Sequence, residues 1–164
     1  MDHPPGKAFL TVAAGLLPGE VTEEDTLALS VMWHLLRIAK SAEAALEYEV
    51  HRPLGWSWPG FRVMANVYVL GPLEPSELAE ILHVSRPTIT VLLNRLERDG
   101  FIERSAHPDS KSQVLAHLTP AGRAAVERAA IPQHQTERKI IAGLTIKQAR
   151  TLATLLERVY ASQT

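Results

Sequence analysis

The spacing of apolar residues in the middle of the chain constrains its fold more than any other sequence feature. Pro75 opens a short segment, SELAEIL, whose Leu and Ala residues recur at helical spacing, and a tight turn follows it. Ser85 can cap a second helix that ends before Gly100. Two short apolar stretches, 101–104 and 113–118, then flank a polar loop. This order predicts a winged helix-turn-helix, because two short helices precede a β-hairpin.

The second helix of this pair has two chemically different faces. Ile89, Leu92, Leu93 and Leu96 fall on the side that is expected to face inward. The outward positions hold Arg86, Pro87, Thr88, Thr90, Val91, Asn94, Arg95 and Arg98. Arg can read guanine edges, Asn can read adenine, and Thr can meet a phosphate or a thymine methyl group in a major groove about 12 Å wide. The alternative is a solvated helix face with incidental arginines, and the hairpin at the right distance favours nucleic-acid binding.

Longer helices are expected on both sides of this region. Thr22 and Asp25 resemble a capping box at the start of a helix of about 28 residues that is apolar on more than one side. After the hairpin, a helix begins at Thr119-Pro120, and Pro132 is expected to bend or break it. Thr145 and Gln148 form a second capping box before an apolar-faced final helix. If these apolar helix faces were exposed on a monomer, they would form a larger hydrophobic patch than soluble monomers usually have.

Composition excludes several function classes. The chain has no Cys, which rules out disulfides, a thiolate metal site and thiol-based sensing. The seven His residues show no zinc spacing, and we expect neither a metal nor a cofactor. There is no Gly-rich phosphate loop, nucleophile elbow or apolar pair of carboxylates, so we expect no enzyme. No apolar run reaches the roughly 20 residues of a membrane span, and the apolar patch 9–17 lacks signal-peptide features, so the expected location is cytoplasmic.

The charge distribution is uneven along the chain. Residues 1–84 carry 5 Lys and Arg against 11 Asp and Glu, whereas residues 85–164 carry 12 against 7. This asymmetry is compatible with an anionic partner for the second half, and equally with ordinary drift in composition.

Three stretches together resemble the multiple-antibiotic-resistance regulator (MarR) family of bacterial transcription factors. They are ELAEIL (77–82), VSRPTITVLLNRLERDGFIER (84–104) and LTPAG (118–122), in the order and spacing of that family. The resemblance implies a mostly α fold with a small β-hairpin wing and with dimerisation helices from both termini. It divides the chain into an N-terminal arm (1–19), a dimerisation helix and loop (20–56), a DNA-binding lobe (57–119) and C-terminal dimerisation helices (120–164).

The resemblance also implies a homodimer on double-stranded DNA, with a recognition helix and a wing from each subunit. The positions that correspond to family DNA contacts are Ser85, Arg86, Pro87, Thr88, Thr90, Val91, Asn94 and Arg95 on the helix, and His107, Asp109, Ser110, Lys111 and Ser112 at the wing tip. Three of them depart from the family pattern. Val91 replaces a polar residue, Asn94 replaces the usual Asp, and Lys111 replaces the wing Arg, which predicts a looser wing with Lys111 as a point charge on phosphate.

Members of the family often bind small aromatic acids or drugs, which implies an aromatic or phenolic ligand here. The candidate residues are Trp33, His34, Arg37, Trp56, Trp58, Arg62 and Tyr68. His34 and Arg37 share a helix face, so one anion could meet both of them. The alternative is that the three Trp residues are packing anchors.

The sequence therefore predicts a sequence-specific transcriptional regulator, with repression expected, that binds an inverted-repeat operator as a homodimer. The alternative is a winged-helix scaffold for protein interactions that does not bind DNA specifically. The best argument for that alternative is the charge of residues 85–119, where five cationic side chains face four acidic ones.

Overall fold

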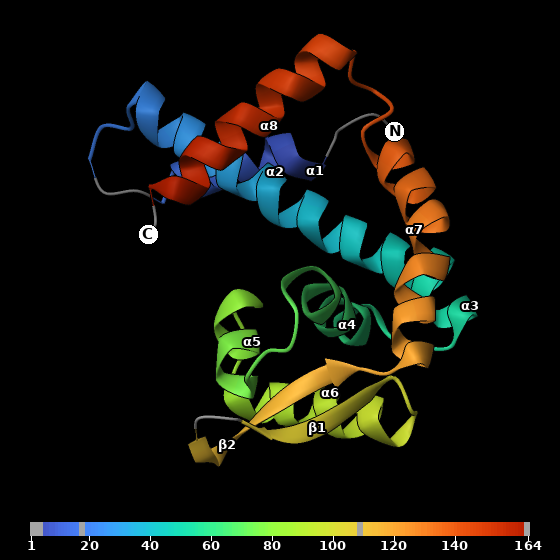
Figure 1. The fold of residues 1–164 in the computed structure, drawn as a ribbon. Coiled ribbons are helices and arrows are strands. Elements are labelled where there is room, and N and C mark those ends of the chain that lie inside the picture. Colours follow the sequence, from blue (N-terminus) through green and yellow to red (C-terminus); the bar gives the residue numbers. More distant parts are fainter. Residues whose placement is uncertain (1–4, 17–18, 108–109, 163–164) are drawn as a thin grey trace. The chain divides into compact units, whose positions relative to one another are not determined.

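The computed structural model describes residues 5–16, 19–107 and 110–162. Internal contacts divide the chain into two units, residues 1–44 and 45–164. The first unit contains α1 (Pro5–Ala14) and most of α2 (Glu23–Ala45) (Figure 1). The second contains η1 (Leu46–His51), α3 (Arg52–Leu54), α4 (Trp58–Leu70), α5 (Pro75–Ile81), α6 (Arg86–Arg98), β1 (Ile102–His107), β2 (Ser110–Leu118), α7 (Pro120–Ile140) and α8 (Ile146–Ala161).

The helices begin where capping residues occur in the sequence. Ser57, Ser85 and Thr119 each accept a backbone N–H from the first turn of α4, α6 and α7, and each is followed by a proline in that turn. The two predicted capping boxes are also present, at Thr22 before α2 and at Thr145 before α8. Local sequence thus determines where these helices start.

The hydrophobic core lies in the second unit and joins α4, α5, α6, the hairpin and α7. Its fully buried side chains include Met64 of α4, Leu78 of α5, Ile89 and Leu93 of α6, and Ile102 of β1. At the start of α7, Gly122 passes so close to the chain that an added Cβ would lie 2.0 Å from the carbonyl oxygen of Phe101. Only glycine fits there, which explains this residue of the LTPAG stretch.

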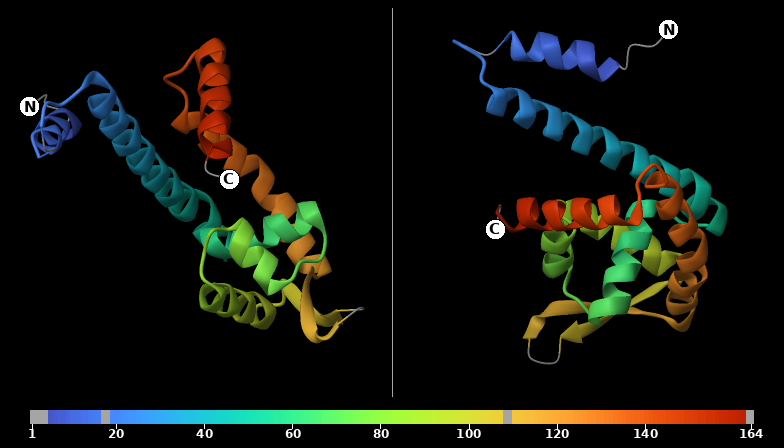
Figure 2. Two further views of the ribbon diagram at one scale, coloured as in Figure 1. Left: turned by 90° about the vertical axis from the view of Figure 1, so that its left-hand side faces the viewer. Right: turned by 90° about the horizontal axis from the view of Figure 1, so that it is seen from above.

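The two strands form an antiparallel hairpin. Ile102 pairs with Leu118 and Arg104 with Ala116, and the strands lie side by side in every ribbon view (Figure 2). A further bridge between Leu73 and Ala116 ties the hairpin to the segment before α5. The predicted fold class, a mostly helical winged helix-turn-helix with a small hairpin, is confirmed.

One local prediction differs from the structure, and for Pro132 one of the two predicted outcomes, a break, is excluded. The first long helix was expected to continue in α form to its end, but residues 46–51 form the π-helix η1 before Gly55, at φ 101°, ends the helical run. Pro132 does not break α7, which runs from Pro120 to Ile140 with the proline inside it. A proline removes one backbone hydrogen bond, and the remaining turns of this 21-residue helix keep it continuous.

In the first unit, α1 is held against α2 by an aromatic contact. The Phe9 and Trp33 rings are stacked, with centroids 3.9 Å apart. Gly6 is buried, and a Cβ at this position would lie 2.9 Å from the indole Nε1 of Trp33. Within the apolar segment 9–17, the chain is helical as far as Ala14, and residue 17 lies outside the described residues.

Candidate nucleic-acid interface

The α6 helix combines a buried face with an exposed polar face, as the sequence predicts. Ile89, Leu93 and Leu96 are buried and hold the helix in the core. The exposed side chains are Arg86, Pro87, Thr88, Thr90, Val91, Asn94, Arg95 and Arg98. The buried face thus fixes the orientation in which the polar face meets solvent.

The first turn of α6 is fixed by a local hydrogen-bond network. The Ser85 side chain accepts the Thr88 backbone N–H, with 3.3 Å between Oγ and N, and its hydroxyl lies 2.8 Å from that of Thr88. The Thr90 hydroxyl donates to the carbonyl oxygen of Arg86. Ser85 is therefore a helix cap. Because the Thr90 hydroxyl hydrogen is used within the helix, its methyl group and oxygen lone pairs remain for contacts outside the helix.

Farther along α6, the candidate Arg95 lies near other charged groups. Its Nε is 3.7 Å from Asp99, and the side chain lines a shallow pocket with Arg52, Trp56 and Ser57. Glu47, at the same pocket, pairs with Arg52 at 3.1 Å. Arg95 is thus part of a mixed-charge surface, whereas no side-chain partner of Arg86 is found among the described residues.

Asn94 has a partner that the sequence does not reveal. The Arg104 guanidinium, on β1, donates to the Oδ1 of Asn94 at 2.7 Å and lies 3.6 Å from Glu97. The Arg104 side chain is three-quarters buried. Sequence reasoning missed Arg104 because the pair depends on how the strand crosses the helix, which no local pattern encodes.

The wing is anchored near its tip to the start of α5 through Glu74. Glu74 accepts a hydrogen bond from Gln113 of β2 at 2.9 Å, and its carboxylate lies 3.9 Å from His107 of β1. It also takes part in the capping box that begins α5, together with Glu77. Ser110, Lys111 and Ser112 belong to β2 by their backbone, but their side chains and Asp109 lie outside the described residues.

The candidate ligand residues fall into both units. Trp33, His34 and Arg37 of the first unit line a cavity of about 520 Å³ between α1 and α2, together with Gly6, Leu10, Ile38 and Ser41. The guanidinium carbon of Arg37 lies 5.5 Å from the centroid of the Trp33 ring. The chain thus brings these three candidates together around one space.

The candidates of the second unit take part in packing. Trp56 is 4% exposed, and its Nε1–H donates to the Nδ1 of the fully buried His51 at 3.1 Å. The His51 ring stacks against Trp58 and Phe61. Burial lowers the pKa of His51 from 6.5 to about 4, although the Glu47 charge acts in the opposite direction.

The remaining two candidates also have protein partners. Arg62 donates to the carbonyl oxygen of Leu82 at 3.5 Å, and the Tyr68 hydroxyl donates to Glu127 at 3.1 Å. The guanidinium of Arg123 lies 5.1 Å from the Tyr68 ring centroid. These contacts link α4 to the turn after α5 and to α7.

Comparison with known proteins identifies the lobe and then the family. The model of the MarR family matches residues 56–114, which span α4 to the wing. The multiple antibiotic resistance protein MarR of Salmonella typhimurium is 32% identical over 108 residues, which cover 65% of this chain and 75% of that protein. The chain belongs to the MarR family.

Other similarities agree with this MarR-family assignment. The transcriptional repressor Mb2911 of Mycobacterium bovis is 30% identical over 107 residues, covering 65% of this chain and 77% of that protein. The crystal structure of a MarR variant from Escherichia coli in complex with operator DNA has a TM-score of 0.73 and 25% identity, covering 86% of this chain and 99% of that one. This MarR-family member is a winged-helix transcriptional regulator.

Two features of the described residues bear on other functions. Over the described ranges, no helix is both long and apolar enough to span a membrane. In the same part of the chain, no three His, Asp or Glu side chains gather as a metal site would require.

Proposed function

We propose that this MarR-family regulator is a repressor that binds an inverted-repeat operator as a homodimer in the cytoplasm. The observation that carries the proposal is α6, an amphipathic helix whose apolar side is buried and whose exposed side carries Arg, Thr and Asn. A rigidly held helix of this kind fits a major groove, and the adjacent hairpin is placed to contact the flanking backbone. The similarity to named repressors supports the direction of control.

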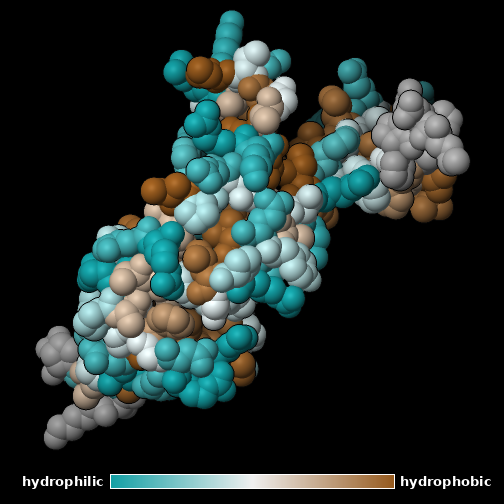
Figure 3. Space-filling view, turned by 90° about the vertical axis from the view of Figure 1, so that its right-hand side faces the viewer, coloured by the Kyte–Doolittle hydropathy of each residue, from teal (hydrophilic) through white to brown (hydrophobic). Residues whose placement is uncertain are grey.

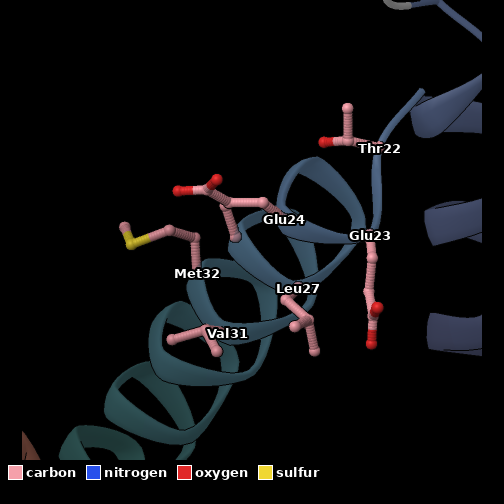
Figure 4. A pocket seen from close by; sticks show the side chains of 7 residues that line it. Thr22, Glu23, Glu24, Leu27, Val31 and Met32 are labelled. Carbon is pink, nitrogen blue, oxygen red and sulfur yellow. The ribbon is translucent and has the colours of Figure 1, made fainter. Parts of the chain in front are cut away.

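The homodimer is supported by helices with unburied apolar faces. No residue of α8 is buried, although Leu152, Leu155, Leu156 and Val159 are spaced along one of its sides. On α2, Leu27, Val31 and Met32 project into an open surface depression (Figure 4). Apolar patches are also visible among the hydrophilic residues of the face in Figure 3. A second copy of the chain would remove this area from water.

Selection from a random duplex library tests this function. We expect the wild-type dimer to recover an inverted repeat whose half-site centres are about 10 base pairs apart. Arg95→Ala should weaken binding to that operator by roughly 1–3 kcal/mol if Arg95 reads a base. Lys111→Ala should weaken binding to all duplexes alike and reduce the salt dependence by about one charge.

The same selection distinguishes a DNA-binding regulator from a winged-helix scaffold for protein interactions. A protein-interaction scaffold would recover no sequence motif and would show no salt-dependent affinity for arbitrary duplex DNA. If Arg95→Ala left the affinity for the selected operator unchanged, the direct role of Arg95 would be wrong, while the function would stand on the recovered motif.

We further propose that a small aromatic or phenolic acid regulates this protein from the cavity between α1 and α2. Trp33 supplies an aromatic wall, and Arg37 supplies a cation for a carboxylate, with His34 beside it in the cavity lining. None of the described residues that line the cavity is acidic. Of the seven candidates, the proposal uses Trp33, His34 and Arg37, because these three line one cavity, whereas Trp56, Trp58, Arg62 and Tyr68 do not line it and have partners in the second unit.

Tryptophan fluorescence and operator release test the ligand site together. A panel of benzoates, hydroxybenzoates and phenols should include a compound that quenches fluorescence and releases operator over the same concentration range. Arg37→Ala should weaken both effects and leave ligand-free binding intact, whereas Lys40→Ala, a cation on the same helix outside the cavity lining, should change neither. Absence of both effects at millimolar concentration would remove the cavity from the proposal.

A further inference from the structure

The contact between Arg104 and Asn94 fixes which end of the Asn94 amide meets DNA. An Arg guanidinium has only N–H donors, so the amide atom that faces it at 2.7 Å is the acceptor Oδ1. The chemistry of the partner therefore settles the amide orientation. The donor group, Nδ2, is the other end of the same planar amide.

Arg104 is held firmly enough to impose this orientation. It lies on β1 two residues after the buried Ile102, so both side chains leave the strand on the side that faces α6. Its guanidinium lies between Asn94 and Glu97, which are three residues apart on α6. The Nε atom of Arg104 is buried without a hydrogen-bond partner among the described residues, so the side chain is enclosed by protein.

This orientation changes how Asn94 can read a base. An Asn that recognises adenine does so through two bonds, donating to N7 and accepting from the N6 amino group. Here the accepting oxygen is already bound to a cation, and an amino group that approached it would bring its partly positive hydrogens next to the guanidinium. A base edge that offers only acceptors avoids this conflict.

We propose that Asn94 is a specificity-determining residue that acts as a hydrogen-bond donor, and that Arg104 is the positioning residue that makes it one. The preferred partner is guanine, because its major-groove edge presents two adjacent acceptors, O6 and N7, and no amino group. Adenine, the usual partner of Asn, is disfavoured at this position. The inference rests on the proposed DNA-binding function.

Library selection with substituted proteins tests the inference. Wild type should select a G·C base pair at one position of each half-site, and Asn94→Ala should lose the preference at that position alone. Asn94→Asp keeps an acceptor for Arg104 but replaces the outward donor with an acceptor. It should bind the wild-type operator at least tenfold more weakly. At the same position it should select the reversed C·G pair or an A·T pair, because an outward acceptor favours the amino group of cytosine or adenine.

The positioning role of Arg104 has its own variant and control. Arg104→Ala frees the amide to turn, so adenine should become acceptable at that position to within about threefold of the wild-type base. Arg98→Ala removes an exposed cation of α6 that pairs with Asp99, and it should leave every base preference unchanged. Circular dichroism and the melting temperature should show that each variant is folded before binding is compared.

Failure of the donor role, of the positioning role and of the proposed DNA-binding function would each give a different result. If wild type recovers no motif, the proposed DNA-binding function fails. If wild type selects an A·T base pair at the position that Asn94→Ala affects, or if Asn94→Asp keeps the wild-type preference, the donor role is overturned while the function stands. If Arg104→Ala leaves the preference at that position unchanged, the positioning role is overturned.

Discussion

The helices α6 and α8 have similar amphipathic patterns but opposite burial. In α6, Ile89, Leu93 and Leu96 are between 0 and 3% exposed. In α8, Leu152 and Leu155 are 42 and 49% exposed, and no residue of the helix is buried. An apolar stripe in the sequence therefore indicates that a helix packs against something, but not whether that surface belongs to the same chain.

This difference separates two roles of hydrophobic burial in the protein. The lobe from α4 to the start of α7 closes its core within one chain, so its stability should not depend on concentration. The apolar face of α8 is not buried within one chain. Any stability gained when a partner chain covers it should therefore depend on protein concentration. Substitutions in α8 and in α6 test this difference in burial. A third, smaller effect concerns the buried His51 at the end of η1.

Placing a charge on the α8 face should have the largest effect. Leu155→Glu buries a carboxylate in the proposed dimer interface, and we expect a monomer of 18.1 kDa and at least a hundredfold loss of operator affinity. Sedimentation velocity and a gel-shift titration measure the two quantities. Thr154→Glu, on the opposite side of the same helix, should remain a dimer of twice that mass. A dimeric Leu155→Glu protein would refute the role given to α8.

A cavity in the α6 face should destabilise the lobe without dissociating the dimer. Leu93 is 1% exposed, and Leu93→Ala should lower the free energy of unfolding by about 2–5 kcal/mol. Urea unfolding at several protein concentrations should show the same decrease at each. Val91→Ala, 67% exposed on the same helix, should change the free energy by about 0.5 kcal/mol or less. A decrease for Leu93→Ala that varied with concentration would place this face in the interface.

The smallest effect concerns pH and His51, which joins η1 to the lobe. Its pKa is about 4 in the folded chain and near 6.5 when unfolded, so the unfolded chain binds more protons between these values. Stability from this residue is complete above pH 6.5 and decreases as the pH falls, by about 2 kcal/mol between pH 7 and pH 5. Urea unfolding at the two pH values measures the decrease.

Substitutions assign that pH dependence. His51→Phe should be less stable at pH 7, since the Trp56 Nε1–H loses its acceptor, but its stability should change less with pH. His134→Gln removes an exposed histidine of α7 and should keep the wild-type dependence. Equal pH dependence in wild type and His51→Phe would show that His51 is not the group responsible.

The parts of the fold that were predictable from the sequence are those set by neighbouring residues. The capping box of Thr145 and Gln148, the proline in the first turn of α6 and the turn before Ser85 all depend on groups within four positions of each other. The π-helix η1 was not predictable, because Leu46, Val50 and His51 are fully or almost fully buried and packing overrides the α-helical pattern there.

The candidate site also has a part that the sequence predicts and a part that it does not. The exposed face of α6 is predictable from the helical spacing of its apolar residues, because burial of Ile89 and Leu93 leaves only one side of the helix for contact. The helical spacing does not predict which tryptophan lines a cavity and which is buried in the core. Trp33 lines a cavity, whereas Trp56 binds a buried histidine, and these two outcomes depend on neighbours that the sequence does not specify.

The sequence by itself thus determined the helix starts, the order of the elements and the face of α6 that is available to DNA. Only the tertiary structure decided that Asn94 is bound by Arg104, that Glu74 anchors the wing through Gln113, and that Gly122 must lack a side chain. The physical reason is the range of the interactions. Caps and periodicity act within one or two helical turns, whereas these contacts depend on the register of a strand and on how it crosses a helix.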